Sequence, residues 1–260
     1  MAPPTFSTLV SGYSFFEGPR WHAGRLWLSD FYTRQVIAVG LDGTVETIAE
    51  VPGQPSGLGW LPDGRLLVVS MRDRKLLRRE PDGRLVEHAD LSAVAGGHAN
   101  DMVVDRQGNA YVGNFGFDLM GGAPFAPARL ARVTPDGTVS AVAEGLYFPN
   151  GSMVTPDGRT LIVGETFGNR LSAFDLLPGG GLPVGAPVRR EAARQEGAKQ
   201  AQPGAQAAQR HPRLVDVFRV GQGTRLGRLQ QGQHVALQLG QTGQRRGAEG
   251  LNRVAVGWQF

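Results

Sequence analysis

Short apolar runs alternate with a recurring turn phrase through the first two thirds of the chain. The phrase joins Asp or Gln to Gly, and it occurs at 41–43, 62–64, 81–83, 106–108, 135–137 and 156–158. Asp and Gly provide the backbone conformations of tight connections between antiparallel strands. The runs that follow are rich in β-forming residues, as in RLLVVS (65–70), NAYVGN (109–114) and RTLIVGE (159–165), and helical periodicity is absent. The pattern therefore predicts an all-β protein built from hairpins.

A larger unit repeats above the level of the hairpins. It begins near Glu17, Ser56, Asn100 and Asn150, which are 39, 44 and 50 residues apart. Repeats of this length with four short strands each are typical of propeller blades. The spacing predicts three full blades before residue 150 and a fourth that begins there. The alternative is an antiparallel sandwich without internal repeats.

The pattern ends after Asp175. Gln occurs 3 times in residues 1–175 and 13 times afterwards, and Asp216 is the one Asp left in the second part. We therefore divide the chain into blades at 1–178 and an irregular, non-matching segment at 179–260. Three explanations of that segment stay open: a disordered linker with a small module, a basic interaction tail, or an out-of-frame reading of a gene. The third is favoured because a natural boundary should fall between blades, since a half-blade leaves an open sheet edge.

Charge and cysteine content narrow the classes of function. Residues 1–175 carry 15 of the 27 Lys and Arg residues and 19 of the 23 Asp and Glu residues, a net charge of −4, whereas the remaining residues carry 12 and 4, a net charge of +8. A basic tail can attract nucleic acid, but few aromatic residues stand between these basic ones, so no nucleic acid partner is expected. The absence of cysteine excludes disulfides, thiolate metal sites and a cysteine nucleophile.

Targeting signals are also missing from the sequence. No apolar run approaches the roughly 20 residues that span a bilayer, so no membrane partner is expected. The N-terminal MAPPTFSTLV lacks the basic and apolar regions of a signal peptide. These observations predict a cytoplasmic protein.

The residues at the blade starts carry the candidate chemistry. The innermost strand of each propeller blade lines the central channel, so equivalent positions of successive blades converge in space. Glu17 offers a carboxylate, and Asn100 and Asn150 offer amide oxygens, a set that suits Ca²⁺, Mg²⁺ or Mn²⁺ and tolerates Zn²⁺. Asn can also serve a turn on its own, but a Glu and two Asn at equivalent positions favour a metal site.

Five phrases in the first part of the chain resemble a known family. They are FFEGPRWH (15–22), HANDMVVD (98–105), YVGNFGFDL (111–119), FPNGSMVTPDG (148–158) and ETFGNRLSAFDL (165–176). Together they are similar to the senescence marker protein / gluconolactonase / luciferin-regenerating enzyme family, over about residues 12–178. The resemblance implies a six-bladed β-propeller, here incomplete, that hydrolyses sugar lactones or related esters with one divalent cation, Ca²⁺ or Zn²⁺, with Mg²⁺ or Mn²⁺ as alternatives.

The resemblance also implies roles for single residues. They are metal ligation by Glu17, Asn100 and Asn150, and substrate contact by His98, Asn100, Asp118 and, more weakly, Asn114. His98 stands where the family often has a basic residue that contacts the substrate. Because His98 lies two residues before Asn100, both would face the channel if both belong to a strand.

The chain departs from the family at one functional position. The family has a further metal-binding aspartate in a later blade, proposed to act as the general base, but residues 195–205 read QEGAKQAQPGA. Asp216 has no matching context, and strand alternation aims Asp101 away from its neighbour Asn100. The catalytic base is therefore unassigned, and loss of the later blades is expected to lower the activity of this chain. The alternative function is a non-catalytic propeller that binds a small ligand or a protein partner.

Overall fold

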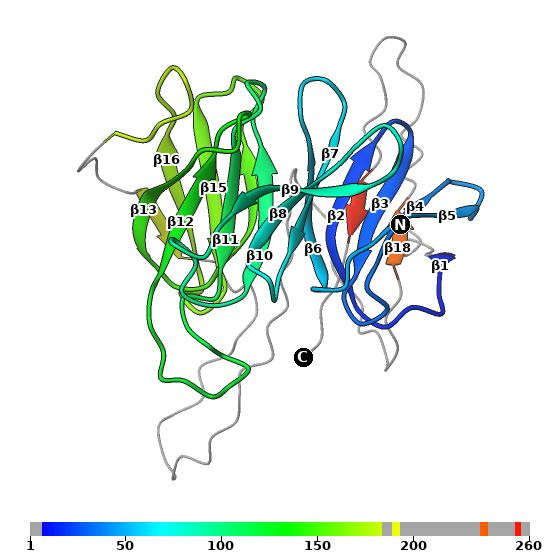
Figure 1. Ribbon diagram of the computed structural model, residues 1–260, viewed down its shortest axis with the longest axis horizontal. Coiled ribbons are helices and arrows are strands. Elements are labelled where there is room, and N and C mark those ends of the chain that lie inside the picture. Colours follow the sequence, from blue (N-terminus) through cyan, green and yellow to red (C-terminus); the bar gives the residue numbers. More distant parts are fainter. Residues whose placement is uncertain (1–6, 184–188, 193–234, 239–252, 256–260) are drawn as a thin grey trace, which may run out of the picture.

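The computed structural model describes residues 7–183, 189–192, 235–238 and 253–255. These residues form strands and turns, with no helix among them. The strands are arranged in four four-stranded sheets and one three-stranded sheet. Figure 1 shows the four larger sheets next to one another, in the order in which they follow along the chain. Within the described ranges, no helix is long and apolar enough to cross a membrane.

Each of the four larger sheets is an antiparallel meander of consecutive strands. The first holds β2 (Phe16–His22), β3 (Arg25–Asp30), β4 (Gln35–Val39) and β5 (Val45–Glu50). The second holds β6 (Pro55–Trp60), β7 (Leu66–Ser70), β8 (Lys75–Arg79) and β9 (Leu85–Asp90). The third holds β10 (Ala99–Val104), β11 (Ala110–Asn114), β12 (Ala128–Val133) and β13 (Val139–Leu146). The fourth holds β14 (Pro149–Val154), β15 (Thr160–Glu165), β16 (Arg170–Asp175) and β17 (Arg189–Ala192).

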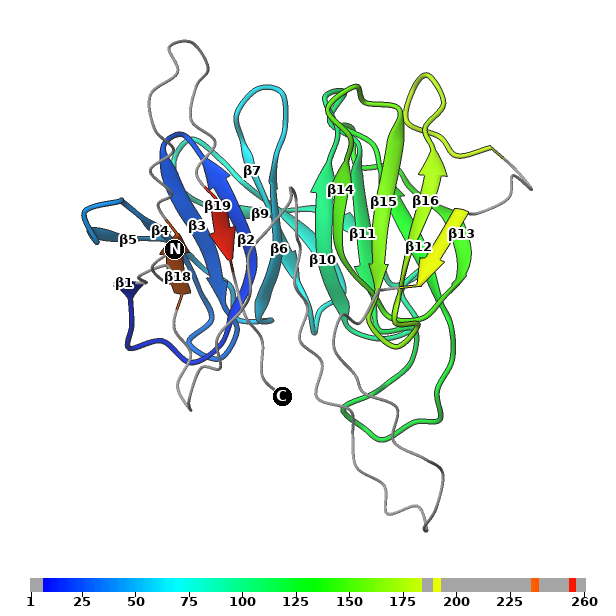
Figure 2. The same ribbon diagram turned by 180° about the vertical axis from the view of Figure 1, so that it is seen from behind.

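The first strand of each sheet contacts the first strand of the next sheet. Strand β6 contacts both β2 and β10, and β10 in turn contacts β14, as the view from behind in Figure 2 also shows for β10 and β14. These four strands form the inner edges of four propeller-like blades, which confirms the prediction of an all-β fold with repeated four-stranded units. The sandwich alternative is wrong, because the strands form four separate large sheets. The six-bladed ring stays a prediction.

Apolar side chains fill the spaces between neighbouring blades. Strand β4 shows how, because its Val36 and Ala38 pack toward the second blade while Ile37 and Val39 pack on the opposite face of the sheet. Between the third and fourth blades, Tyr111 packs with a cluster that includes Leu161 and Val163. A strand that is buried on both faces needs apolar residues at successive positions. This is why strands such as QVIAV and LLVVS are almost continuously apolar.

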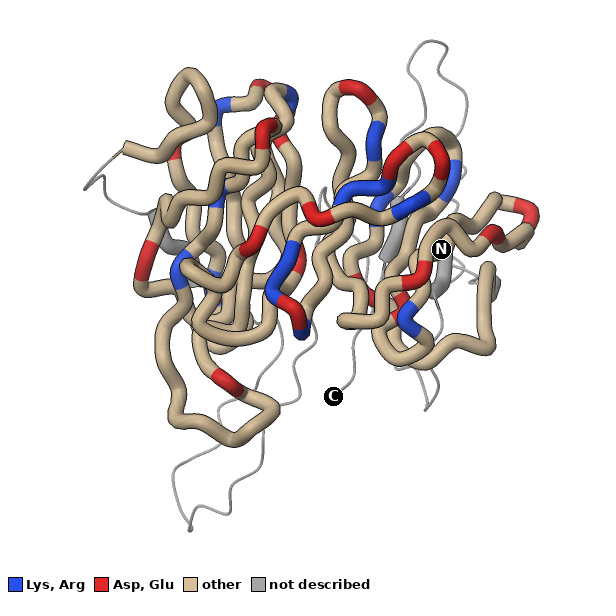
Figure 3. The backbone as a smooth tube through the Cα atoms, in the orientation of Figure 1, with Lys and Arg blue, Asp and Glu red and all other residues tan. Residues whose placement is uncertain are grey.

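The recurring turn phrase closes the hairpins as the sequence predicts. In each Asp-Gly phrase, the Asp carboxylate accepts a hydrogen bond from the backbone N–H two residues later, at 3.0 to 3.1 Å; the acceptors are Asp42, Asp63, Asp82, Asp136 and Asp157. The glycine of each phrase has a positive φ, between 73° and 89°, which costs a glycine little and other residues more. Figure 3 shows charged residues at these hairpin tips.

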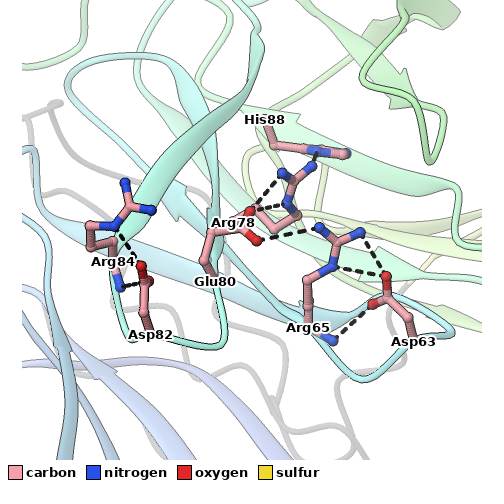
Figure 4. A network of polar contacts seen from close by, with 7 residues as sticks. All are labelled: Asp63, Arg65, Arg78, Glu80, Asp82, Arg84 and His88. Carbon is pink, nitrogen blue, oxygen red and sulfur yellow. Dashed lines mark hydrogen bonds and ion pairs between the residues drawn. The ribbon is translucent and has the colours of Figure 1, made fainter.

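The second blade carries a charged network. It lies next to the last residues of β6, whereas Ser56 lies at the first residues of that strand. Arg65 pairs with Asp63 and Glu80, and Arg78 pairs with Glu80 and contacts His88 (Figure 4). Beside it lies a groove of about 270 Å³ whose lining includes Trp27, Trp60 and Arg65. The groove is therefore separate from the residues at the blade starts.

Three strands come from the segment 179–260 that the sequence separates from the blades. Strand β17 pairs with β16 and completes the fourth sheet. Strands β18 (Val235–Gln238) and β19 (Arg253–Ala255) form the three-stranded sheet with β1 (Ser7–Val10), in the order β1–β18–β19. The other residues of the segment after 183 lie outside the described ones, so its division from the blades stays a prediction.

Candidate functional site

The four blade-start residues occupy the same place in their sheets. Glu17, Ser56, Asn100 and Asn150 are each the second residue of the first strand of a blade. In all four blades the register with the second strand shifts at this position or directly after it. Such a β-bulge bends the strand and changes the direction of its side chains. The repeat found in the sequence therefore corresponds to a repeat in backbone geometry.

Close backbone contacts join these positions from blade to blade. A Cβ on Gly18 would lie 2.5 Å from the carbonyl oxygen of Ser56, and a Cβ on Gly57 would lie 2.5 Å from the backbone nitrogen of Met102. Glycine at these two places permits the approach of neighbouring inner strands. The amide Nδ2 of Asn100 donates to the carbonyl oxygen of Pro149 at 3.3 Å. The structure thus brings the four blade starts together in order, at one end of the sheets.

The donor set at this end is buried and rich in oxygen. Glu17 is 9% exposed, Asn100 is 2% exposed and Ser56 is fully buried, while Asn150 is half-buried. The Ser56 hydroxyl is buried without a hydrogen-bond partner among the described residues. One carboxylate, two amide oxygens and a hydroxyl fit a hard divalent cation. No group of three or more His, Cys, Asp and Glu side chains that could hold a metal ion is present in the described part, so a cation here would depend on the amide oxygens.

A polar residue at the end of the second strand of each blade lies next to the blade-start residue, on the neighbouring strand. Asp30, Ser70, Asn114 and Glu165 pair with the residue just before each blade-start position. The Asp30 carboxylate accepts from the N–H groups of Ser14 and Phe15, both at 2.9 Å.

Asn114 and Glu165 support their own blades in the same way. Asn114 accepts from the N–H of Gly116 at 2.9 Å, and Glu165 accepts from the N–H of Tyr147 at 2.7 Å. These bonds fix the loops that lead into or out of the strands of the site. The sequence analysis missed Asp30, Ser70 and Glu165 and named Asn114 only as a substrate contact, although a polar residue closes each of the runs RLWLSD, LLVVS, AYVGN and TLIVGE.

His98 lies beside the site, but not on the strand. It precedes the first residue of β10, and its carbonyl oxygen accepts from the N–H of Phe115 at 2.9 Å. The assumption that His98 and Asn100 share a strand is therefore wrong, and alternation cannot fix its direction. Its Nδ1 is buried without a hydrogen-bond partner among the described residues. Burial, and then the positive charge of Arg72, lower the pKa of His98, while Asp118 acts in the opposite direction.

The remaining candidates have partners of their own. Asp118 is exposed, and its carboxylate accepts from the N–H of Gly121 at 2.9 Å. Asp101 pairs with Arg20 of β2 at 2.7 Å. Asn114 also donates to the carbonyl oxygen of Arg129 at 2.6 Å. Asp216 and residues 195–205, where the family's aspartate is missing, lie outside the described residues.

The fold and this cluster define a propeller protein with a candidate cation pocket at the inner ends of its blades. The chain belongs to the SMP-30/gluconolactonase/LRE-like family, whose model matches residues 15–201. Pentonolactonase XacC from Haloferax volcanii is 29% identical over 152 residues, which are 58% of this chain and 49% of that protein. A second curated relative, from Rhizobium meliloti, is matched over 57% of its length at 26% identity. The chain thus spans about half the length of the curated relatives it matches.

Solved structures agree on the fold. A gluconolactonase from Xanthomonas campestris matches with a TM-score of 0.58 at 24% identity, over 74% of this chain and 71% of that one. A protein described as the calcium-binding regucalcin, from Agrobacterium tumefaciens, matches with a TM-score of 0.59 at 24% identity, over 73% of this chain and 63% of that one. At this identity the likeness shows a shared propeller-like fold.

Proposed function

We propose that the protein hydrolyses a small-molecule lactone, a sugar lactone or a related ester, with a divalent cation held by Glu17, Asn100 and Asn150. The observation that carries the proposal is the equivalence of these three residues, each second in the inner strand of its blade. Membership of the family and the likeness to a pentonolactonase support the class of reaction. Ca²⁺ and Zn²⁺ are the first candidates, and Mg²⁺ and Mn²⁺ are alternatives.

The chemistry divides between the cation and the side chains. A bound divalent cation polarises a carbonyl oxygen and lowers the pKa of water, as ester hydrolysis requires. Glu17 supplies the one negative charge of the proposed ligand set, while the two Asn side chains add neutral oxygens. Asn100, with His98 and Asp118, would contact the substrate and hold its carbonyl toward the pocket.

The proton acceptor remains unassigned. The aspartate that the family resemblance implies has no counterpart at residues 195–205. A general base contributes typically about 10² to 10⁴ in rate, so we expect slow turnover. The same departure favours the second candidate function, a propeller that binds a ligand without chemistry. The cytoplasmic location stays a prediction.

A titration with Ca²⁺ and with Zn²⁺, followed by calorimetry, tests the proposed pocket. We expect Glu17→Gln to weaken binding of the preferred cation about tenfold or more, because the ligand set then loses its negative charge. Asn100→Ala and Asn150→Ala should each weaken it as well. The matched control is Glu46→Gln, which removes an exposed carboxylate of the same blade and should leave affinity unchanged.

Lactone opening, followed by acid release at constant pH, then separates the two functions. Opening that a chelator abolishes and that Glu17→Gln reduces supports the hydrolase. Cation binding without any lactone opening supports the binding propeller. If Glu17→Gln binds the cation as tightly as the unchanged protein, the ligand assignment is wrong.

A further inference from the structure

Aromatic side chains gather between the third and fourth blades, at the same end of the sheets as the candidate pocket. We call this group the aromatic rim; its members are Phe115, Phe117, Phe125, Tyr147, Phe148 and Phe167. Three come from the connection between β11 and β12, two from the connection between β13 and β14, and one from the turn between β15 and β16. The sequence pattern does not predict this group, because its members lie far apart in the sequence, in connections of two different blades.

The rim begins next to the proposed ligands. The ring of Phe115 lies 5.6 Å from that of His98 and stacks on Phe148 with a centroid distance of 4.3 Å. Phe148 stands two residues before Asn150, and the carbonyl oxygen of the intervening Pro149 accepts from Asn100. The chain of ring contacts therefore reaches the residues proposed to hold the cation.

The rim then reaches solvent. The ring of Phe167 lies 4.8 Å from Phe148 and 6.4 Å from Phe125, and the ring of Phe125 lies 5.0 Å from that of Tyr147. Phe125, Phe167 and Tyr147 are 49%, 46% and 38% exposed. Met120, in the same connection as Phe125, is 64% exposed. Exposed apolar surface of this kind, beside a proposed cation site, is typical of a binding site.

Two charged side chains close to the rim each have a protein partner. The Arg170 guanidinium lies over the ring of Tyr147 at 4.9 Å, but both of its bonds go to the Glu165 carboxylate, at 2.8 Å each. The carboxylate of Asp118 accepts from the N–H of Gly121. The rim itself thus presents ring faces and edges to a ligand, and the polar contacts of a substrate would fall to His98, Asn100 and Asp118 beside it.

We propose that the aromatic rim is a specificity subsite that takes an apolar, planar substituent of the substrate. The substrate class is then an aryl-substituted lactone, which the protein prefers over a polyhydroxylated sugar lactone. This proposal deepens the proposed function and rests on it. Its physical basis is that rings packed edge-to-face or offset add to the free energy gained from burial of apolar area.

Two matched non-opening analogues test the subsite in the full chain: a phenyl-substituted γ-lactam and a polyhydroxylated γ-lactam. We expect calorimetry to show binding of the phenyl lactam about tenfold tighter or more. The double variant Phe125→Ala/Phe167→Ala should bring the two affinities close to parity. The control is Leu41→Ala, which removes an exposed apolar side chain of the first blade and should leave the ratio unchanged. Circular dichroism checks the fold of each variant, and Phe167→Ala alone serves if the double variant does not fold.

The outcomes separate this proposal from the proposed function. Equal or tighter binding of the polyhydroxylated lactam overturns the subsite, and so does failure of both lactams to bind. A preference for the phenyl lactam that the rim variants leave unchanged also overturns it. If the preference depends on the rim but no lactone is opened, the subsite stands and the hydrolase proposal fails.

Discussion

At the scale of single residues, equivalent backbone positions of the four blades hold Glu, Ser, Asn and Asn. Glu17, Asn100 and Asn150 could be selected from the sequence because the repeat length aligns them. Their supports could not, because Asp30 and Glu165 act through strand pairing and loop hydrogen bonds that depend on register. The position of His98 was mistaken because a strand boundary depends on pairing as well as on alternation, and β10 begins one residue later.

One ion pair shows how distant residues hold the site together. Arg20 of β2 donates to the Asp101 carboxylate at 2.7 Å and also to the carbonyl oxygen of Met102. The Asp101 side chain is 7% exposed. The pair connects the first blade to the third, next to Asn100, and so fixes two inner strands that carry proposed ligands.

We predict that Arg20→Met destabilises the protein by about 3 kcal/mol, because it leaves a buried carboxylate without its partner. Arg25→Met is the matched control. Arg25 pairs with Glu46, whose side chain is 60% exposed, and loss of an exposed pair should cost about 1 kcal/mol or less. Urea unfolding measures both. Equal losses for the two variants would show that the inner pair has no special structural role.

At the scale of elements, the turn phrases and the strands beside them were predicted well because both depend on local chemistry. The runs at 65–70, 109–114 and 159–165 correspond to β7, β11 and β15 within one residue. The aromatic rim was not predicted, because it forms where long connections of two blades meet. The sequence pattern also gave no sign that Arg189–Ala192 completes the fourth sheet.

The turn glycines offer a matched test of contacts between blades. Gly64 and Gly137 both have positive φ, 85° and 89°. A Cβ on Gly64 would meet nothing within 4 Å, whereas a Cβ on Gly137 would lie 2.4 Å from the carbonyl oxygen of His88 in the second blade.

We predict that Gly64→Ala costs about 1 to 2 kcal/mol of unfolding free energy, from the left-handed backbone alone. Gly137→Ala should cost about 1 kcal/mol more, because the added methyl group clashes with the neighbouring blade. Denaturant unfolding of both variants gives the difference. If the two variants lose the same stability, the contact of the third blade's turn with His88 is not tight in solution.

At the scale of the whole molecule, the four blades contact one another through their inner strands, and the fourth blade also holds a buried charge. The side chain of Glu165 is fully buried in its pair with Arg170. Burial opposes its ionisation, but hydrogen bonds from Arg170, Ser172 and the N–H of Tyr147 outweigh burial and hold the pKa of Glu165 below its usual range. The turn aspartates also have lowered pKa values, because they accept hydrogen bonds.

A carboxylate with a lowered folded-state pKa stabilises the protein above its unfolded pKa, which is about 4.3 for Glu, and loses that contribution as the pH falls through its folded pKa. We therefore predict that the unfolding free energy of the unchanged protein is level near neutral pH and falls below about pH 4.

Glu165→Gln should be less stable at neutral pH and should show a shallower fall, because its side chain no longer titrates. Arg170→Met should lose most stability at neutral pH and least in acid, where protonated Glu165 no longer requires a positive partner. The turn aspartates are the same in all three proteins, so their contribution cancels when urea unfolding curves are compared between pH 7 and pH 3. Parallel pH profiles for the unchanged protein and Glu165→Gln would mean that this buried pair does not couple the fourth blade's stability to protonation.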